Sequence, residues 1–206
     1  MKEVDVAAKF FGVRSSLFHP SHRRKSSFWS SGFTKYFSSV LISDLIETPL
    51  GPMTAIANDR GLLLCEFGDR RALPGQLARV HKLFGGAPTL GRHRFLDQTR
   101  EELGEYFDGK RQIFTIPLVI VGTPFQERVW HELLKVPFGK TTVYSQLGER
   151  IGRAGAARAV GRANGDNRIA IIVPCHRVLG ADGSLTGYGG GKDRKQWLLD
   201  HEANAR

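Results

Sequence analysis

The chain has 206 residues and a formal net charge of +10, with a pI of ≈ 10.0. This length can bury a core without disulfide bonds, and two cysteines are too few for a disulfide framework or a four-thiolate zinc site. The basic balance favours nucleic acid or an anionic membrane surface as partner. No apolar stretch reaches the roughly 20 residues of a membrane span and no secretory signal is evident, so we expect a soluble, cytoplasmic protein.

Residues 1–40 differ in composition from the rest. After Asp5 there is no acidic residue until Asp44, and HRRKSSFWSSG mixes basic, serine and aromatic residues without a period. We interpret residues 1–40 as a basic tail, either disordered or the remnant of another domain, with a weak nucleic-acid arm as a third reading.

Residues 41–122 predict a small α/β domain with an antiparallel sheet. The runs VLISDLIETP, MTAIAND and LLLCEF are short, apolar and bounded by turn residues, as is typical of strands. Two helices should follow, and in the second one face collects Phe95, Leu96, Thr99, Leu103, Tyr106 and Phe107 before Gly109 ends it. IFTIPLVIV is expected to return to the sheet as an edge strand, because Pro117 has no N–H to donate.

Residues 123–206 predict a mostly helical domain. Thr123 can cap a helix, Pro124 suits its first turn and Gln126 can close a capping box. Short helices are expected over Ser145–Gly152 and Ala154–Ala163, and their Gly-containing junction indicates a helix-turn-helix.

The second of these helices, AGAARAVGRANG, is small on nearly every side except at Arg158 and Arg162. A helix without bulk can approach a nucleic-acid backbone closely. The alternative is that it packs tightly against a neighbouring helix.

Cys175 stands in IVPCHRVLG, between a proline and a histidine at the end of an apolar run. A free thiol has a pKa of about 8.5, so a nucleophilic cysteine needs help from its surroundings. Pro174 predicts that a strand ends there and presents Cys175 at a turn, whose backbone N–H groups would favour the thiolate. His176 is a candidate base, acting through a bridging water because adjacent side chains diverge.

A last helix is expected around KQWLLDHE. If it packs on the cysteine loop, Glu202 accepts a hydrogen bond from His176 and holds it in one tautomer. The alternative is that Cys175 is a buried small apolar residue, as we expect for Cys65 within LLLCEF. No second Cys/His pair has ligand spacing, so we expect no zinc.

Five segments in order, TPFQERVW, GAARAVGRANGDN, VPCHRV, TGYGGG and WLLDHE, resemble the O6-alkylguanine-DNA alkyltransferases, also called methylated-DNA–protein-cysteine methyltransferases, and most of all their bacterial single-function branch. The resemblance is nearly continuous from Thr123 to Glu202 and looser from about Val40 to Val121. It implies an α+β fold, with a ribonuclease-H-like N-terminal domain and a winged-helix-like C-terminal domain. The implied activity is irreversible, cofactor-free transfer of an alkyl group from O6 of guanine, and less well from O4 of thymine, onto the protein's own cysteine.

The resemblance also implies roles for individual residues. Cys175 matches the acceptor, His176 the water-mediated base and Glu202 its orienting partner. Asn167 matches the asparagine that braces the turn between recognition helix and active site. Tyr144 matches the tyrosine that crowds the target phosphate and donates to N3 of guanine.

Further matches concern DNA and the base. Arg158 matches the arginine finger that fills the hole left by a flipped base. The other DNA contacts implied are Tyr144, Gln126, Ser145, Ala157, Gly161 and Arg162. The carbonyls of Cys175 and Val178 would accept from the guanine amino group, and Tyr188 and Gly189 would contact the substrate. Some relatives carry serine where this chain has Gly189; the glycine keeps the N–H that donates to O6, and we expect a looser loop that admits larger alkyl groups.

The implied partner is double-stranded DNA, bound through its minor groove by a monomer with the alkylated guanine flipped out. A base inside a duplex cannot reach a buried thiol, so extrusion is required at a cost of a few kcal/mol. Guanine is the leaving group, and donors at its N3 and O6 stabilise the developing charge. The product is a thioether, so one molecule should repair one lesion.

Two other functions fit parts of the pattern. A non-enzymatic helix-turn-helix protein would bind DNA sequence-specifically and leave Cys175 replaceable. A cysteine hydrolase using Cys175, His176 and Glu202 would turn over, whereas an alkyltransferase reacts in a single stoichiometric burst.

Overall fold

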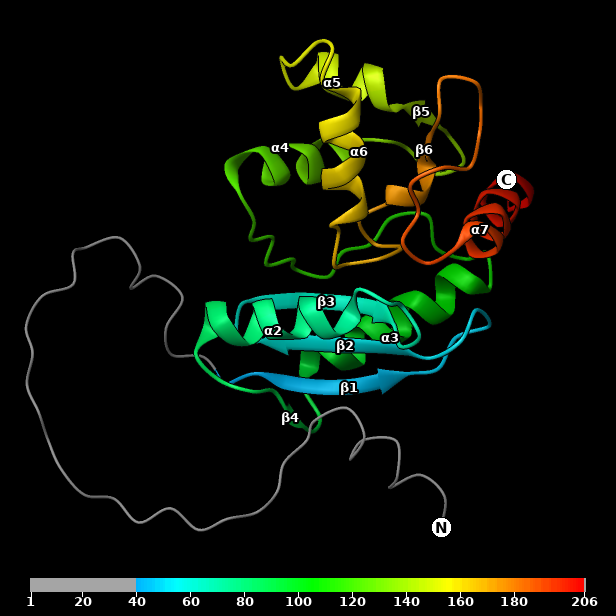
Figure 1. Cartoon of the computed structure of the whole chain (residues 1–206). Helices are drawn as coiled ribbons and strands as arrows, with labels where there is room; N and C mark the ends of the chain where they lie inside the picture. Colours follow the sequence, from blue (N-terminus) through cyan, green and yellow to red (C-terminus); the bar gives the residue numbers. More distant parts are fainter. Residues whose placement is uncertain (1–39, 206) are drawn as a thin grey trace, which may run out of the picture. The chain divides into compact units, whose positions relative to one another are not determined.

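The computed structural model describes residues 40–205, so the tail predicted for residues 1–40 lies outside the described residues except for Val40. The N-terminal half of the described part contains a four-stranded sheet. β1 (Ile42–Ile46), β2 (Met53–Asn58) and β3 (Gly61–Phe67) form an antiparallel meander, and β4 (Thr89–Leu90) pairs in parallel with β1 (Figure 1). The sheet is therefore mostly, rather than wholly, antiparallel.

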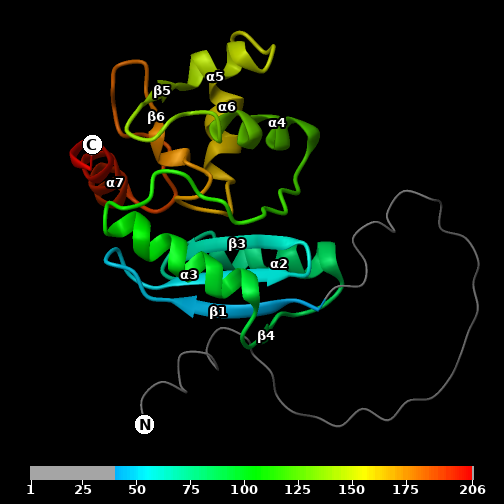
Figure 2. The same ribbon diagram turned by 180° about the vertical axis from the view of Figure 1, so that it is seen from behind.

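Two helices cover opposite faces of this sheet (Figures 1 and 2): α2 (Leu73–Phe84) and α3 (Arg94–Phe107). The alternation of side chains along β2 accounts for this arrangement. Met53 and Ala55 are buried in the same cluster as Leu103 of α3, whereas Ile56 is buried with Val80 of α2.

The edge strand predicted at IFTIPLVIV is wrong. Within the described residues this segment pairs with β3 only at an isolated bridge between Leu62 and Leu118, where Leu62 donates to the carbonyl of Pro117 (2.8 Å) and Val119 donates back to Leu62 (2.8 Å). Pro117 has no N–H, so the ladder cannot continue through it. β4 had no sequence signal, because it is two residues long and exposed.

The C-terminal half is mostly helical. In chain order it contains α4 (Pro124–Leu133), β5 (Thr142–Val143), α5 (Tyr144–Arg150), α6 (Ala157–Gly165), a 3₁₀ turn η1 (Cys175–Arg177), β6 (Val178–Leu179) and α7 (Lys192–Asn204). The capping box predicted for Thr123 and Gln126 begins α4. β5 and β6 pair in parallel, beside the α5–α6 helix-turn-helix. Together the two halves confirm the predicted α+β fold.

The helices of the helix-turn-helix are displaced from their predicted bounds. α5 ends at Arg150 and α6 begins at Ala157, so the junction is longer than the sequence pattern indicated. Gly152 and Gly155 both adopt left-handed backbone conformations in this junction (φ 69° and 79°), which stop the first helix and delay the second.

β3 also contacts the segment that follows α6. Cys65 donates to the carbonyl of Arg168 (2.9 Å), and Ala170 donates to the carbonyl of Cys65 (2.7 Å). This pairing ties the end of the helix-turn-helix to the sheet. Among residues 40–205, no helix combines the length and the apolar character that a membrane span requires.

Candidate active site

Cys175 begins the η1 turn directly after Pro174, as predicted, and is only 4% exposed. The strand predicted to end at Pro174 is absent, because residues 170–173 form a turn and a bend and only Ile169 bridges to β3. The N–H of Cys175 donates to Val173 (2.7 Å) and that of Arg177 to Pro174 (3.1 Å), so neither of these two N–H groups is available to a thiolate. Ile171, four residues earlier, has φ +70° although it is β-branched. Such a strained conformation persists only where surrounding contacts hold it.

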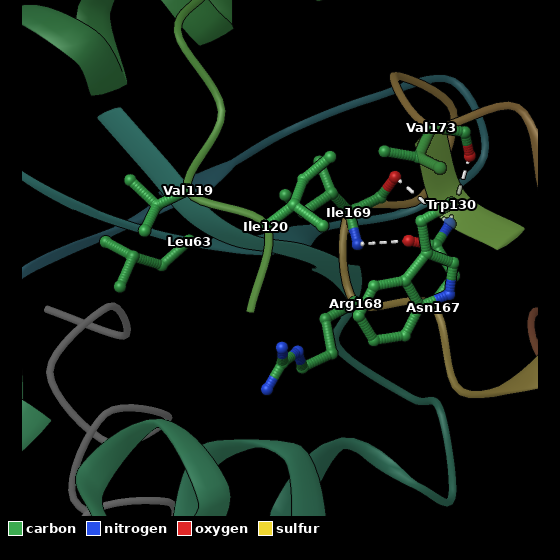
Figure 3. Close-up of a pocket in the computed structure, with 8 residues that line it drawn as sticks. All are labelled: Leu63, Val119, Ile120, Trp130, Asn167, Arg168, Ile169 and Val173. Atoms are coloured by element: carbon green, nitrogen blue, oxygen red, sulfur yellow. Dashed lines mark hydrogen bonds between the residues drawn. The ribbon is translucent and has the colours of Figure 1, made fainter. Parts of the chain in front are cut away.

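Asn167 supplies those contacts (Figure 3). Its side-chain oxygen accepts from the N–H of Ile169 (3.0 Å), and its Nδ2 donates to the carbonyls of Ile169 (3.2 Å) and Val173 (3.0 Å). The same Nδ2 lies 3.1 Å from Sγ of Cys175. Asn167 thus holds both ends of the turn and provides the acceptor sulfur with a hydrogen-bond donor. A second amide, that of Asn164, donates to the carbonyl of Cys175 (3.2 Å).

The next residue, His176, is fully buried and paired with α7. Its Nε2 lies 2.8 Å from Oε1 of Glu202. Arg177 donates to both oxygens of that carboxylate (2.9 Å each). The hydroxyl of Tyr106 also donates to Oε1 (2.9 Å), and the N–H of Gly139 donates to Oε2 (2.9 Å). These donors hold the pKa of Glu202 far below its usual range despite burial. An ionised carboxylate only accepts, so Nε2 of His176 carries the proton.

Nδ1 of His176 is therefore the basic nitrogen of the ring, and within residues 40–205 it is buried without a hydrogen-bond partner. Burial lowers the pKa of His176, so the ring is neutral at physiological pH. Burial also raises the pKa of Cys175 to about 11, against the opposing effect of the Asn167 hydrogen bond. The thiol is protonated at rest, and a neutral imidazole is available to accept its proton.

A third group of contacts orders the loop that follows η1. Lys195 of α7 is buried and donates to the carbonyls of Val178 (2.5 Å) and Thr186 (2.9 Å). Burial lowers the pKa of Lys195 to about 8. Tyr144 donates to Thr186 as well (2.8 Å), and burial raises its pKa, so its hydroxyl keeps its proton. A Cβ at Gly187 would overlap the Tyr144 hydroxyl, which requires glycine there.

Two family models match this chain. The 6-O-methylguanine DNA methyltransferase ribonuclease-like domain matches residues 41–120, and the DNA binding domain of the same family matches residues 124–204. The chain belongs to the 6-O-methylguanine DNA methyltransferase family. The resemblance proposed from the sequence motifs is thereby confirmed.

Relatives of this methyltransferase cover most of it. The methylated-DNA–protein-cysteine methyltransferase of Shigella flexneri is 43% identical over 167 residues, which are 79% of this chain and 95% of the relative. That of Methanosarcina barkeri is 40% identical over 161 residues (78% and 96%). A crystal structure of Mycobacterium tuberculosis OGT in complex with DNA has a TM-score of 0.69 and 41% identity, with 80% of this chain and 93% of that chain covered.

The DNA-facing residues expected from the family resemblance lie on α5 and α6 of the methyltransferase. Arg158, Arg162 and Ser145 are exposed, and Ala157 and Gly161 are half-buried. One side of the small-residue helix packs against a neighbouring helix, because Gly161 lies against the ring of Tyr144. The other side is open for close approach of a partner, because Arg158 and Arg162 face solvent.

Gln126, the remaining residue expected to contact DNA, lies on α4 and is hydrogen-bonded within the protein. Its side chain closes the capping box with Thr123 (3.0 Å) and donates to Asp166 at the end of α6 (2.8 Å). Those bonds occupy its amide in the described structure. A role in DNA contact stays a prediction.

Some residues of the site had not been singled out from the methyltransferase sequence. Arg177 and Lys195 were overlooked because charged residues are seldom buried, and Tyr106 was assigned to a helix face without a role for its hydroxyl. The usable signal was the position of Arg177 directly after His176, two residues from the cysteine. Tyr188 was expected near the substrate, and its hydroxyl is buried without a partner within the described part, beside the His176 ring (centroids 6.5 Å apart).

Proposed function

We propose that this methyltransferase repairs DNA by moving the alkyl group of O6-alkylguanine onto Sγ of its own Cys175, once per molecule. Its family membership makes it a DNA-binding repair protein that transfers an alkyl group from DNA to a cysteine. The observation that carries the choice of Cys175 is the Asn167 hydrogen bond to Sγ, next to the buried pair of His176 and Glu202. Cys65, by contrast, is fully buried within β3, and burial raises its pKa well above the ordinary value.

The reaction begins with the thiol proton. No hydrogen bond joins Sγ of Cys175 to His176 in the described part, so the proton passes to Nδ1 through a water molecule. Glu202 and Arg177 hold the ring, and the carboxylate stabilises the imidazolium that forms. Asn167 remains as a donor to the sulfur when it becomes a thiolate.

The sulfur then attacks the alkyl carbon. An S–C bond forms as the C–O6 bond breaks, and the electron pair of that bond goes to the guanine, which is the leaving group. Tyr144 would exchange its hydrogen bond to Thr186 for one to N3, while the N–H of Gly189 would donate to O6. The proton taken up by His176 then returns through water to the departing guanine. The carbonyl of Val178 has a second lone pair beside its bond to Lys195 and can accept from the guanine amino group.

DNA is the partner, and the proposed binding surface is the α5–α6 helix-turn-helix. A small-residue helix fits the narrow minor groove, and Arg158 would occupy the stack position vacated by the flipped guanine, which offsets part of the unstacking cost. The domain division that we propose follows the predicted boundaries, with residues 41–122 as support and 123–206 as the DNA-binding and acceptor domain. We place the protein in the cytoplasm, where a reducing environment keeps an acceptor thiol free.

The test is intact-protein mass spectrometry after reaction with excess duplex that carries O6-methylguanine, followed by peptide mapping. We expect the mass of one methyl group on the peptide that contains Cys175, with no second addition at longer times. A protein that binds the duplex and stays unmodified would support the non-enzymatic DNA-binding alternative. Release of product with continued turnover would support a hydrolase.

Replacing Arg158 with alanine is expected to slow repair of duplex DNA by about ten- to a hundredfold, because flipping loses the side chain that fills the vacated stack. Reaction with free O6-benzylguanine requires no flipping and should change less than about threefold. Single-turnover rates on both substrates measure this difference. Arg153→Ala, an exposed arginine in the preceding junction, is the control for charge alone. If Arg158→Ala slowed the reaction with both substrates equally, Arg158 would not be the residue that fills the vacated stack.

A further inference from the structure

The segment between α6 and the acceptor turn is held by side chains from the N-terminal half. The carbonyl of Asn167 accepts from Nη1 of Arg70 (3.0 Å) and from Nε2 of Gln76 (3.1 Å). Arg70 also donates through Nη2 to the carbonyl of Gly165, the last residue of α6. Arg70 thus donates hydrogen bonds to the last residue of α6 and to Asn167, two residues further along the chain.

Arg70 is itself built into the interior. It is 8% exposed and forms an ion pair with Glu66, which is fully buried on β3. Glu66 is held in turn by the N–H of Phe67 (3.0 Å). Nε of Arg70 has no hydrogen-bond partner within residues 40–205. A buried, charged side chain with an unpaired donor is costly to place in the interior.

The guanidinium of Arg70 also lies against Gly189. The backbone of Gly189 is outside the left-handed region, so it does not require glycine for conformational reasons. A Cβ built on it would nevertheless overlap Nη2, Cζ and Nε of Arg70. The space that a side chain at position 189 would need is therefore filled by the guanidinium.

We infer that Arg70 is a positioning residue for alkyl transfer, which aligns the acceptor turn through the carbonyls of Gly165 and Asn167 and supports the substrate loop at Gly189. This inference rests on the proposed function, because the alignment matters only if Sγ of Cys175 and the N–H of Gly189 must reach the same alkylated guanine. It gives the N-terminal half a part in the reaction.

Electrostatics point the same way. The charge of Arg70 opposes the rise in the pKa of Cys175 that burial causes, whereas Glu66 adds to that rise. With both residues present the two effects oppose each other near the sulfur. Burial raises the pKa of Glu66 and Arg70 opposes that rise, so loss of Arg70 alone would leave a buried carboxyl without its partner. Loss of the charges of both Arg70 and Glu66 would remove both effects on the pKa of Cys175 and would still open the space beside Gly189.

The test is a double-mutant cycle between positions 70 and 189, on the full chain. The variants are Gly189→Ala, Arg70→Ala with Glu66→Gln, and the three changes combined; the paired change avoids an uncompensated buried charge. Single-turnover methyl transfer from O6-methylguanine duplex is measured at saturating DNA, together with the duplex Kd and the thermal midpoint. Arg111→Ala, whose guanidinium pairs with Glu105 on α3, is the control.

We expect Gly189→Ala to slow the chemical step by about tenfold or more in the wild-type background and by less than about threefold where Arg70 is absent. Kd should change little throughout, because the DNA-facing arginines are untouched. Gly189→Ala that is harmless in the wild type, or equally harmful in both backgrounds, overturns the inference while the wild type still reacts. A wild type that transfers no methyl group overturns the proposed function, and this inference with it.

Discussion

Cys175→Ala is expected to abolish methyl transfer, while Cys65→Ala retains it. Both cysteines are buried, but only Cys175 accepts a hydrogen bond from Asn167 at its Sγ and lies in a turn beside an available base. Alanine removes the nucleophile and leaves the turn, the brace and the DNA-facing helix in place. Cys175→Ala should therefore still bind duplex DNA, with a Kd close to that of the wild type.

The measurement is the number of methyl groups per protein after reaction with O6-methylguanine duplex, by intact mass. Cys65→Ala is the matched control, because it removes the other thiol from the protein interior and its cost is confined to stability. Transfer that survives in Cys175→Ala and fails in Cys65→Ala would show that the acceptor had been assigned to the wrong cysteine.

His176→Gln is expected to slow transfer by about 10²- to 10⁴-fold at pH 7. With the pKa of Cys175 at about 11, only about 10⁻⁴ of the thiol is ionised at neutral pH without a base. Glutamine can still donate to Glu202, so the network keeps a partner, but it cannot accept a proton. The loss isolates proton transfer from packing.

The pH dependence gives this prediction its sharpest form. The pKa of His176 is lowered, so above about pH 6.5 the wild-type base is neutral and the rate should be nearly flat up to about pH 8, where Lys195 begins to lose its proton. In His176→Gln the rate should follow the thiolate fraction, which rises about tenfold per pH unit until the pH approaches the thiol pKa. The ratio of the wild-type rate to the His176→Gln rate therefore falls as the pH rises.

His201→Gln is the matched control. His201 is a half-buried histidine of α7 whose Nε2 lies 2.7 Å from the carbonyl of Tyr106, away from the sulfur. Its replacement should leave the pH profile unchanged. Parallel profiles for the wild type and His176→Gln across pH 7–10 would exclude His176 as the base.

Local patterns in the sequence were sufficient for most of the helices and strands and for the family. The capping box at Thr123, the strand runs and the stretch around Cys175 each involve residues close in sequence, where backbone preferences and side-chain spacing act directly. The segment with Pro117 failed because its pairing depends on one missing N–H rather than on apolar content. The order of the motifs identified the alkyltransferases, and that identification holds.

The tertiary structure decided how the reactive groups are held. Five donor groups distant in sequence converge on Glu202, and only packing of α7 against η1 and α3 brings the side chains of His176, Arg177 and Tyr106 to it. The contact between Arg70 and Gly189 likewise joins residues of the two halves. Hydrophobic pattern sets which faces are buried, but a buried polar group needs a partner from whatever element the fold places beside it, and no local preference encodes that choice.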